Sequence, residues 1–191
     1  MVEEKLSRGT DMKLEAETLF KYGIPPRFQD ADLAKALLRV AEPGKVDRFI
    51  SGDLQGLFIP GMNGCGKTYL SCAIMKTMME SRIHCFRSDA IQLVSSYTEG
   101  SAWEIPTKYL QPKVLVLDEV AKELTSSTAR LVLEVLITWR GENEKQTILV
   151  SNIGLAQIEE KYGPTIPSKI REFYEPVRLP DEDLRKKSPS S

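Results

Sequence analysis

The clearest chemical signal in this sequence is the stretch at residues 61–68, which reads GMNGCGKT and meets the pattern G-x-x-x-x-G-K-[ST] in full. An apolar run at residues 56–59 precedes it, and a helix-compatible stretch at residues 69–80 follows it. This strand–loop–helix context is what the motif requires. Glycines let the backbone wrap a phosphate chain and aim its N–H groups inward, and the next helix adds the positive end of its dipole. The stretch therefore predicts a site for the phosphates of a nucleotide.

Two side chains of this loop have predicted chemical parts. Lys67 can reach the β- and γ-phosphates as a point charge, and Thr68 can offer its hydroxyl to Mg²⁺. Cys65 is interpreted as a small tolerated loop residue with no redox role. The residues expected to bind the nucleotide are Gly61, Asn63, Gly64, Cys65, Gly66, Lys67, Thr68 and Tyr69.

Two acidic residues follow a second apolar run. Residues 114–117 read VLVL, which is typical of a strand buried on both faces, and Asp118 and Glu119 come directly after it. Ligands of open α/β sheets bind at the carboxyl ends of the strands. We expect Asp118 to hold Mg²⁺, mostly through water, and Glu119 to orient or deprotonate an attacking water. Taken alone, the pair is also compatible with a plain solvated strand end.

A third run, at residues 147–151, ends in Asn152. An amide at this position can reach between the γ-phosphate and the water, and so respond to the state of the nucleotide. An asparagine chosen for a turn is the competing interpretation on spacing alone.

Composition describes an ordinary soluble domain. The chain has 191 residues, of which 41% are hydrophobic and 28% charged, and its formal net charge is −1. Because no global basic field is present, contact with DNA would depend on local patches. The polar N-terminus lacks a secretory signal and no apolar run is long enough to span a bilayer, so no membrane association is expected. The three cysteines show neither a CxxC pair nor metal-ligand spacing, which favours a reducing, cytoplasmic location.

Strands and helices alternate along the chain, which indicates parallel strands joined by crossover helices. A turn is predicted at residues 43–44, which read PG. We expect a short helical arm at residues 1–20, one domain at residues 21–180 and a charged flexible tail at residues 181–191. The predicted strands cover residues 57–60, 83–87, 114–117, 147–151 and 177–179. The predicted helices cover residues 12–22, 32–40, 67–80, 89–97, 128–140 and 155–162.

The sequence resembles the AAA+ ATPases of the DnaC and DnaI helicase-loader group and their relative, the IstB transposition helper. Four segments carry the likeness: residues 22–28 (YGIPPRF), 61–70, 114–119 and 147–152. The resemblance implies a P-loop NTPase fold of the AAA+ (ASCE) type, with a parallel five-stranded sheet flanked by helices and no C-terminal lid domain. It also implies that residues 22–28 lie beside the adenine end of the nucleotide, and that Asn152 is the sensor-1 residue.

A fifth segment, residues 168–172 (SKIRE), is similar to a stretch of this family in which an arginine reaches the ATP site of a neighbouring subunit. Lys169 stands at the place of that arginine, and Arg171 follows two positions later. A lysine cannot fork two hydrogen bonds as a guanidinium does, so Arg171 is the candidate catalytic residue in trans. Arg140 is expected either to face a neighbouring subunit or to be a simple helix-end cation.

The function implied by the resemblance is an ATPase that uses ATP and Mg²⁺ to assemble as a homo-oligomer on single-stranded DNA or on a replicative helicase. Its turnover would be slow and stimulated by oligomerisation or DNA. The alternative is an IstB-type helper that acts on target DNA with a transposase. A nucleotide-gated binding module and a small-molecule kinase are further readings, the kinase being disfavoured because no lid-like arginine cluster is present. Candidate DNA contacts, for which an ordinary solvated crossover is an equal alternative, are Lys108, Lys113, Lys122, Arg130, Trp103 and Tyr109.

Overall fold

The computed structural model describes residues 14–99, 104–120 and 126–184. Its centre is a five-stranded sheet of parallel strands in the order β2-β3-β4-β1-β5. This arrangement confirms the predicted fold class. The strands are β1 (Gly56–Pro60), β2 (Cys85–Asp89), β3 (Val114–Asp118), β4 (Gln146–Ser151) and β5 (Glu175–Pro176).

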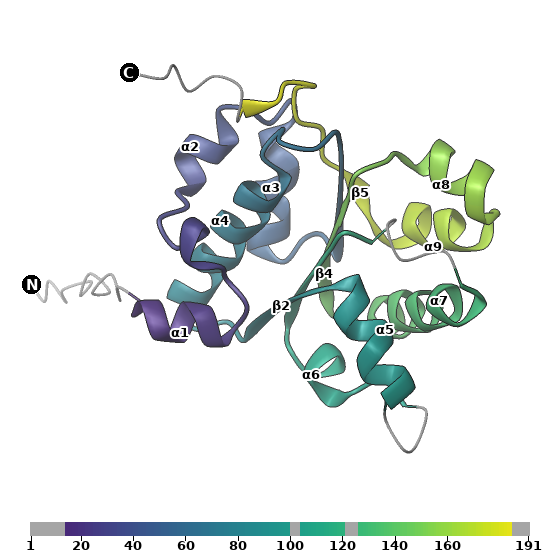
Figure 1. Ribbon diagram of the computed structural model, residues 1–191. Coiled ribbons are helices and arrows are strands. Elements are labelled where there is room, and N and C mark those ends of the chain that lie inside the picture. Colours follow the sequence, from purple (N-terminus) through teal and green to yellow (C-terminus); the bar gives the residue numbers. More distant parts are fainter. Residues whose placement is uncertain (1–13, 100–103, 121–125, 185–191) are drawn as a thin grey trace, which may run out of the picture.

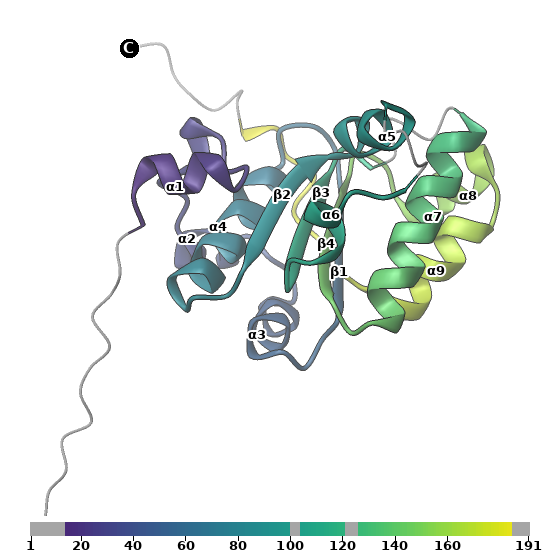
Figure 2. The same ribbon diagram turned by 90° about the horizontal axis from the view of Figure 1, so that it is seen from below.

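Helices cover both faces of the sheet, so that the molecule has three layers (Figures 1 and 2). A short 3₁₀ turn, Pro26–Phe28, follows the first helix. One face carries α1 (Ala16–Lys21), α2 (Leu33–Leu37), α3 (Pro43–Ser51) and α4 (Lys67–Glu80). The other face carries α5 (Ala90–Glu99), α6 (Thr107–Leu110), α7 (Ser127–Glu142), α8 (Leu155–Tyr162) and α9 (Thr165–Phe173).

The apolar run of β3 explains why both faces are covered. Val114 and Val116 belong to the core under α4, whereas Leu115 and Leu117 belong to the core under α7. Successive side chains of a strand point to opposite faces, so four consecutive apolar residues need an apolar layer on each side. All of them are fully buried.

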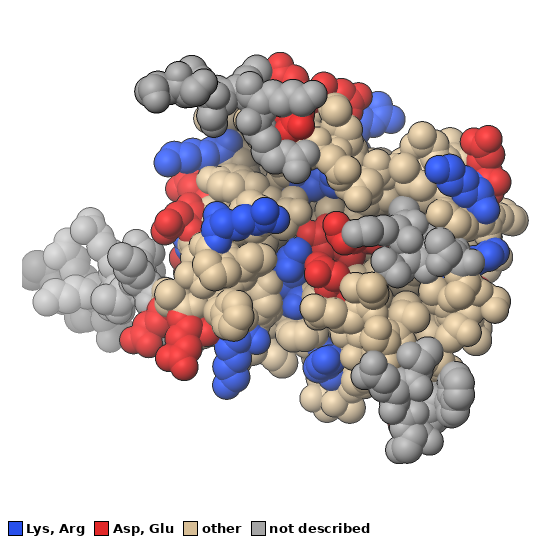
Figure 3. Space-filling model, viewed as in Figure 1, with Lys and Arg blue, Asp and Glu red and all other residues tan. Residues whose placement is uncertain are grey.

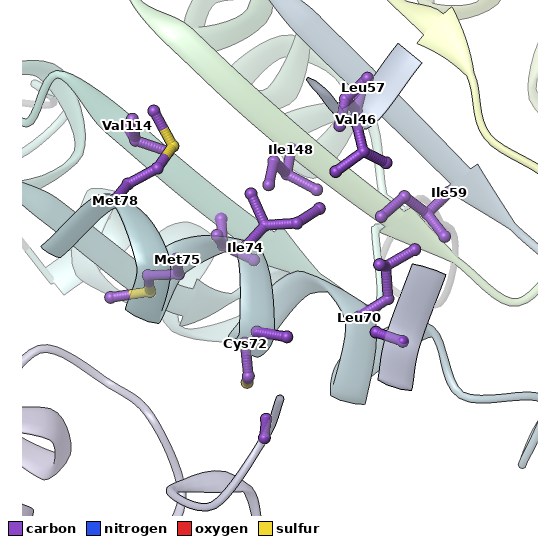
Figure 4. Close-up of a cluster of buried hydrophobic side chains, with 14 of the residues drawn as sticks. Val46, Leu57, Ile59, Leu70, Cys72, Ile74, Met75, Met78, Val114 and Ile148 are labelled. Carbon is purple, nitrogen blue, oxygen red and sulfur yellow. The ribbon is translucent and has the colours of Figure 1, made fainter. Parts of the chain in front are cut away.

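The layer of α4 fixes the helix that begins in the glycine-rich loop. Ile74 points toward Ile148 of β4, and Met78 lies beside Val114 of β3 (Figure 4). Full burial of a side chain of this kind stabilises the folded state by about 1.5–3 kcal/mol. The start of α4, and with it Lys67, is therefore anchored to the centre of the sheet.

Three predictions of secondary structure were wrong. Residues 43–44 do not form a turn between elements but begin α3, because proline is favourable in the first turn of a helix and Val46 and Phe49 are buried against the sheet. The last strand is not residues 177–179 but Glu175–Pro176, which pairs with β1. Residues 165–173, which were not assigned a helix, form α9 because Ile166 and Ile170 share one buried face.

Two further differences concern segment ends. The helix predicted from residue 12 begins at Ala16 within the described residues, and its Leu19 packs into the core. The helix predicted at residues 89–97 extends to Glu99, and α6 (Thr107–Leu110) forms where no helix was predicted. Within the described ranges, no helix is both long and apolar enough to cross a membrane.

A candidate nucleotide site at the carboxyl ends of the strands

A pocket of about 620 Å³ opens where β1, β3 and β4 end. Its walls come from residues 25–28, the glycine-rich loop, the end of β2 and the residues that follow β3 and β4. Acidic and basic side chains gather near the centre of this face, between the two helical layers (Figure 3). This is the edge at which ligands bind in open α/β sheets.

The glycine-rich loop has the backbone that its glycines were expected to permit. Gly64 and Gly66 have φ angles of 85° and 104°, in a region that other residues rarely enter. Gly61 has a φ of 153°, and a Cβ atom there would lie 3.0 Å from the Cys65 sulfur. The Cys65 side chain is buried, and Cys65 is not among the residues that line this pocket.

Lys67 lies inside this loop. Its Nζ atom donates hydrogen bonds of 2.8 Å to the carbonyl oxygens of Gly61 and Met62, and the residue is 6% exposed. The Gly61 N–H donates in turn to the Ser151 carbonyl at the end of β4, at 3.1 Å. The loop, the lysine and the end of β4 therefore form one connected unit.

Thr68 and Asp118 meet across fifty residues of sequence. The Thr68 hydroxyl donates to Oδ2 of Asp118 at 3.0 Å, and Asp118 is 5% exposed. A hydroxyl and a carboxylate are oxygen donors of the kind that Mg²⁺ prefers, and they lie close enough to share one ion and its waters. The residues present therefore fit the metal that the sequence pattern implies.

Glu119 has an unusual backbone. Its φ angle is 56°, a left-handed conformation that costs a residue with a side chain about 1–3 kcal/mol. The Glu119 N–H donates to Oδ1 of the neighbouring Asp118 at 2.8 Å, which helps to hold this conformation. The turn brings the side chain into the wall of the pocket, where Asn152 also lies. The acidic pair and the asparagine thus share the site with the loop.

Arg87 is part of this site although the sequence analysis did not single it out. It lies on β2, and its Nη2 atom donates to Oδ2 of Asp118 at 2.7 Å and to Oδ1 of Asp89 at 3.3 Å. Burial lowers the pKa of the guanidinium, but the nearby charges, Asp118 foremost, outweigh this and the pKa lies above its ordinary value. The signal that could have revealed it is a charged residue, Arg87 itself, at the end of the strand predicted at residues 83–87.

The pre-core segment, residues 22–28, closes the far end of the pocket. Pro25 and Phe28 line it, and the Arg27 guanidinium lies 4.5 Å from the centre of the Phe28 ring. Leu184 lines it as well and donates its N–H to the Gly64 carbonyl at 3.1 Å. Leu184 was expected in a solvated tail, but it lies against the loop; residues 185–191 lie outside the described residues.

The candidates for action in trans lie elsewhere. Arg171 pairs with Glu159 on the surface of α8 and α9, and Lys169 pairs with Glu172 at 2.9 Å. The hydrogen bond that Lys169 donates to the Glu172 carboxylate raises the pKa of Lys169. Neither cation belongs to the residues that line the pocket of its own chain.

Arg140 was expected either to face a neighbouring subunit or to be a simple helix-end cation. It does lie in the last turn of α7, but its burial contradicts a subunit-facing position. Its side chain is fully buried. The guanidinium donates to the Thr147 hydroxyl at 2.7 Å and to the Gln146 carbonyl at 2.7 Å. Further bonds go to the carbonyls of Tyr109, Leu110, Pro112 and Lys113. The residue braces the interior and cannot reach a neighbour.

The suggested DNA contacts do not form one stripe. Tyr109 is fully buried and offers no face for stacking on a base. Lys113 precedes β3 and donates to the Glu144 carbonyl, so it lies at the amino edge of the sheet. Arg130 lies in the first turn of α7, at the opposite, carboxyl edge, over the Tyr162 ring. Trp103 and Lys122 lie outside the described residues.

Comparison with known proteins now identifies the family. The family described as "IstB-like ATP binding protein" matches residues 45–167, which include the loop, the acidic pair and Asn152. The chain belongs to this family. At the level of sequence, no curated protein gives a significant match.

Solved structures agree with this family of IstB-like ATP-binding proteins. The crystal structure of the DnaC helicase loader matches with a TM-score of 0.67 and 26% identity, over 82% of this chain and 100% of that chain. The crystal structure of DnaI has a TM-score of 0.67 at 22% identity, over 83% of this chain and 95% of that one. The initiator DnaA bound to AMPPCP and single-stranded DNA has a TM-score of 0.69 at 19% identity, over 82% of this chain and 51% of that one. The predicted AAA+ P-loop fold is thereby confirmed.

Proposed function

We propose that this IstB-like protein is a magnesium-dependent ATPase of the helicase-loader type. The observation that supports it best is the meeting of Lys67, Thr68, Asp118, Glu119 and Asn152 at one pocket, although they come from three separate stretches of the chain. A phosphate loop alone binds a nucleotide. Two acidic residues and an amide at the same pocket are the additional groups that hydrolysis needs.

Each residue has a defined part in this proposal. Lys67 leaves the loop carbonyls and bonds the β- and γ-phosphates, while the loop N–H groups orient the phosphate chain. Thr68 and Asp118 hold Mg²⁺, which would supply charge neutralisation at these phosphates. Glu119 accepts a proton from the attacking water, and Asn152 donates a hydrogen bond that positions that water.

The site is completed by a second copy of the chain. Arg171 is exposed on α9, outside the pocket of its own chain, as a residue that acts on a neighbour must be. A trans-acting arginine is worth about 10³–10⁵ in rate where it operates. We therefore propose slow turnover for the single chain and faster turnover in a homo-oligomer. Lys169, with its point charge, is the weaker candidate for this role.

The loader role rests on the likeness to DnaC, which extends over the whole of that chain. In this role ATP would assemble the subunits on a replicative helicase or on single-stranded DNA, in the cytoplasm. Single-stranded DNA appears beside a related fold in the DnaA complex. The match to the IstB-like family supports a second candidate, a transposition helper that uses the same site on target DNA.

Two substitutions test the ATPase. Lys67→Ala is expected to abolish ATP binding, measured by calorimetry, whereas Lys161→Ala on the exposed face of α8 should bind as the unchanged protein does. Glu119→Gln should bind ATP and lose phosphate release, with Glu160→Gln as its matched control. Normal turnover by Glu119→Gln would rule out its role as the base.

Mixing experiments test the shared site. Glu119→Gln supplies an intact Arg171 but no base, and Arg171→Ala supplies an intact base but no cation. Activity restored on mixing the two inactive proteins supports action in trans, and inactivity at every ratio argues against it. Binding of the purified protein to a purified replicative helicase, compared with binding to a transposase of the IS21 type, separates the two biological roles.

A further inference from the structure

A largely buried arginine lies against the carboxylate that is expected to hold the metal. Nη2 of Arg87 is 2.7 Å from Oδ2 of Asp118, and this same oxygen accepts the hydroxyl of Thr68. The Arg87 side chain is 10% exposed and the Asp118 side chain 7%. The guanidinium therefore neutralises Asp118 at the one oxygen that faces Thr68.

Other groups hold Arg87 on both sides. Nη2 also reaches Asp89, and Nη1 donates to the Gly23 carbonyl at 3.3 Å. Its Nε atom is buried and has no hydrogen-bond partner among the described residues. The guanidinium thus keeps one donor unused while it lies in the wall of the nucleotide pocket.

Electrostatics makes two cations compete for one oxygen. A guanidinium and Mg²⁺ repel each other when both lie against Oδ2 of Asp118, and burial strengthens this repulsion because little water screens it. Without a cation, in contrast, the buried Asp118 would repel the phosphates of ATP. Arg87 and Mg²⁺ are therefore alternative partners of the same carboxylate.

We propose that Arg87 is a positioning residue that neutralises Asp118 before the metal binds, and gives up this carboxylate oxygen when Mg²⁺ binds with ATP. It thereby sets how strongly nucleotide binding depends on Mg²⁺. The inference rests on the proposed ATP site and goes beyond it, since it assigns a residue on β2 outside the loop and the acidic pair. Arg87 acts through Asp118 and is not assigned a part in the chemical step.

The same residue connects the metal side of the pocket with the pre-core segment. The Arg87 backbone N–H donates to the Tyr22 carbonyl at 2.9 Å. Gly23 packs so closely that a Cβ atom there would lie 2.1 Å from the Arg87 carbonyl oxygen. Arg87 is therefore in direct contact both with Asp118 and with residues 22–28, at the other end of the pocket.

The test compares binding of the ATP analogue AMPPCP to the full chain, by calorimetry, in EDTA and in excess Mg²⁺. For Arg87→Met we expect affinity in EDTA to fall about tenfold, because Asp118 is left without a neutralising cation and repels the phosphates. In Mg²⁺ the loss should stay within about threefold, because the metal supplies the missing charge to Asp118. Arg48→Met, an exposed arginine of α3, should leave both affinities unchanged. Arg87→Lys keeps the charge, and its affinity in EDTA should lie between that of Arg87→Met and that of the unchanged protein.

Equal losses in EDTA and Mg²⁺, or no loss in either, would overturn the inference while leaving the proposed ATP site intact. Failure of the unchanged protein to bind AMPPCP in Mg²⁺ would overturn the ATP site itself. If Arg87→Met does not fold, Asp118→Asn and the double variant Arg87→Met with Asp118→Asn replace it, since the double variant leaves no buried carboxylate at position 118 without its partner. The double variant should then bind metal-free AMPPCP within about threefold of Asp118→Asn, because Arg87 acts through Asp118, and binding about tenfold weaker than that of Asp118→Asn would contradict the inference.

Discussion

Arg140 is fully buried and Arg87 largely so, but they lie at opposite edges of the same sheet and have different partners. Arg87, at the carboxyl edge, bonds two carboxylates, Asp118 and Asp89. Arg140, at the amino edge, bonds the Thr147 hydroxyl and backbone carbonyls. Arg140 therefore stabilises the interior of the fold, whereas Arg87 belongs to the candidate nucleotide site.

The pKa values record this difference. Burial without a carboxylate partner lowers the pKa of Arg140 to about 10, although the nearby Tyr174 opposes the shift. Arg87 is also buried, yet the charge of Asp118 keeps its pKa above the ordinary value. No metal ion competes for the backbone carbonyls that bind Arg140, so its hydrogen bonds are permanent. Asp118 has an alternative partner in a metal ion, so the bond to Arg87 is exchangeable.

The largest effect on stability is expected from Arg140→Met. The substitution leaves several buried carbonyls without a donor, and it should lower the free energy of unfolding by about 3–5 kcal/mol. Urea denaturation followed by circular dichroism measures it, with Arg48→Met as an exposed control. The folded fraction should still bind ATP. A loss below about 1 kcal/mol would mean that water or other groups replace the brace.

Arg87→Met is expected to cost less, about 2–3 kcal/mol, because Asp118 lies at the wall of a pocket where water can reach it. A double-mutant cycle with Asp118→Asn should give a coupling free energy of about 1–2 kcal/mol in metal-free buffer. Excess Mg²⁺ with ATP should reduce this coupling, since the metal replaces the guanidinium. Additive effects in metal-free buffer would contradict the ion pair.

The stability of the protein at alkaline pH tests the effect of burying uncharged thiols, separately from the effect of ion pairs. Burial raises the pKa of the Cys85 thiol from 9.0 to about 12, and that of Cys72 to about 11. A folded pKa above the unfolded one gives stability that is complete below pH 9 and is lost as pH rises toward these values. Between pH 8 and pH 10 the ionisation of each thiol in the unfolded chain should lower the free energy of unfolding by about 1 kcal/mol. Urea denaturation of Cys85→Ala should show a smaller decline over this range, and an equal decline would refute burial as its cause.

Arg140 has the opposite sign in a higher range. Burial lowers its folded pKa to about 10, below the ordinary value, so its contribution to stability rises with pH above about 10 rather than falling. Restricting the thiol measurement to pH 10 and below keeps the two effects separate.

The smallest effect is expected at the surface. Arg171→Ala removes an exposed ion pair with Glu159 and should change the free energy of unfolding by no more than about 0.5 kcal/mol. Its ATP turnover at high protein concentration, by contrast, should fall strongly if the residue acts in trans. A large loss of stability, measured by urea denaturation, would assign Arg171 to the fold of its own chain.

Local patterns were sufficient for most of the fold. The alternation of apolar runs and helix-compatible stretches predicted that strands and helices alternate along the chain and that the strands are parallel. The reason is that each strand is buried on both faces and is joined to the next by a crossover helix. Patterns failed where one local signal has two uses. Proline and glycine at residues 43–44 suggested a turn, yet proline also suits the first turn of a helix, and the burial of Val46 decided for α3.

The candidate site divides in the same manner. Lys67 and Thr68 belong to a contiguous motif, and Asp118 and Glu119 follow an apolar run, so the sequence alone determined that these types of residue stand at strand ends. Only the tertiary structure decided the distances between these residues and which other side chains contact them. Arg87 meets Asp118 because β2 and β3 lie in register, and Arg140 meets the chain before β3 because α7 packs across it. A charged residue takes its role from its buried partners, and those partners come from distant positions that local spacing does not encode.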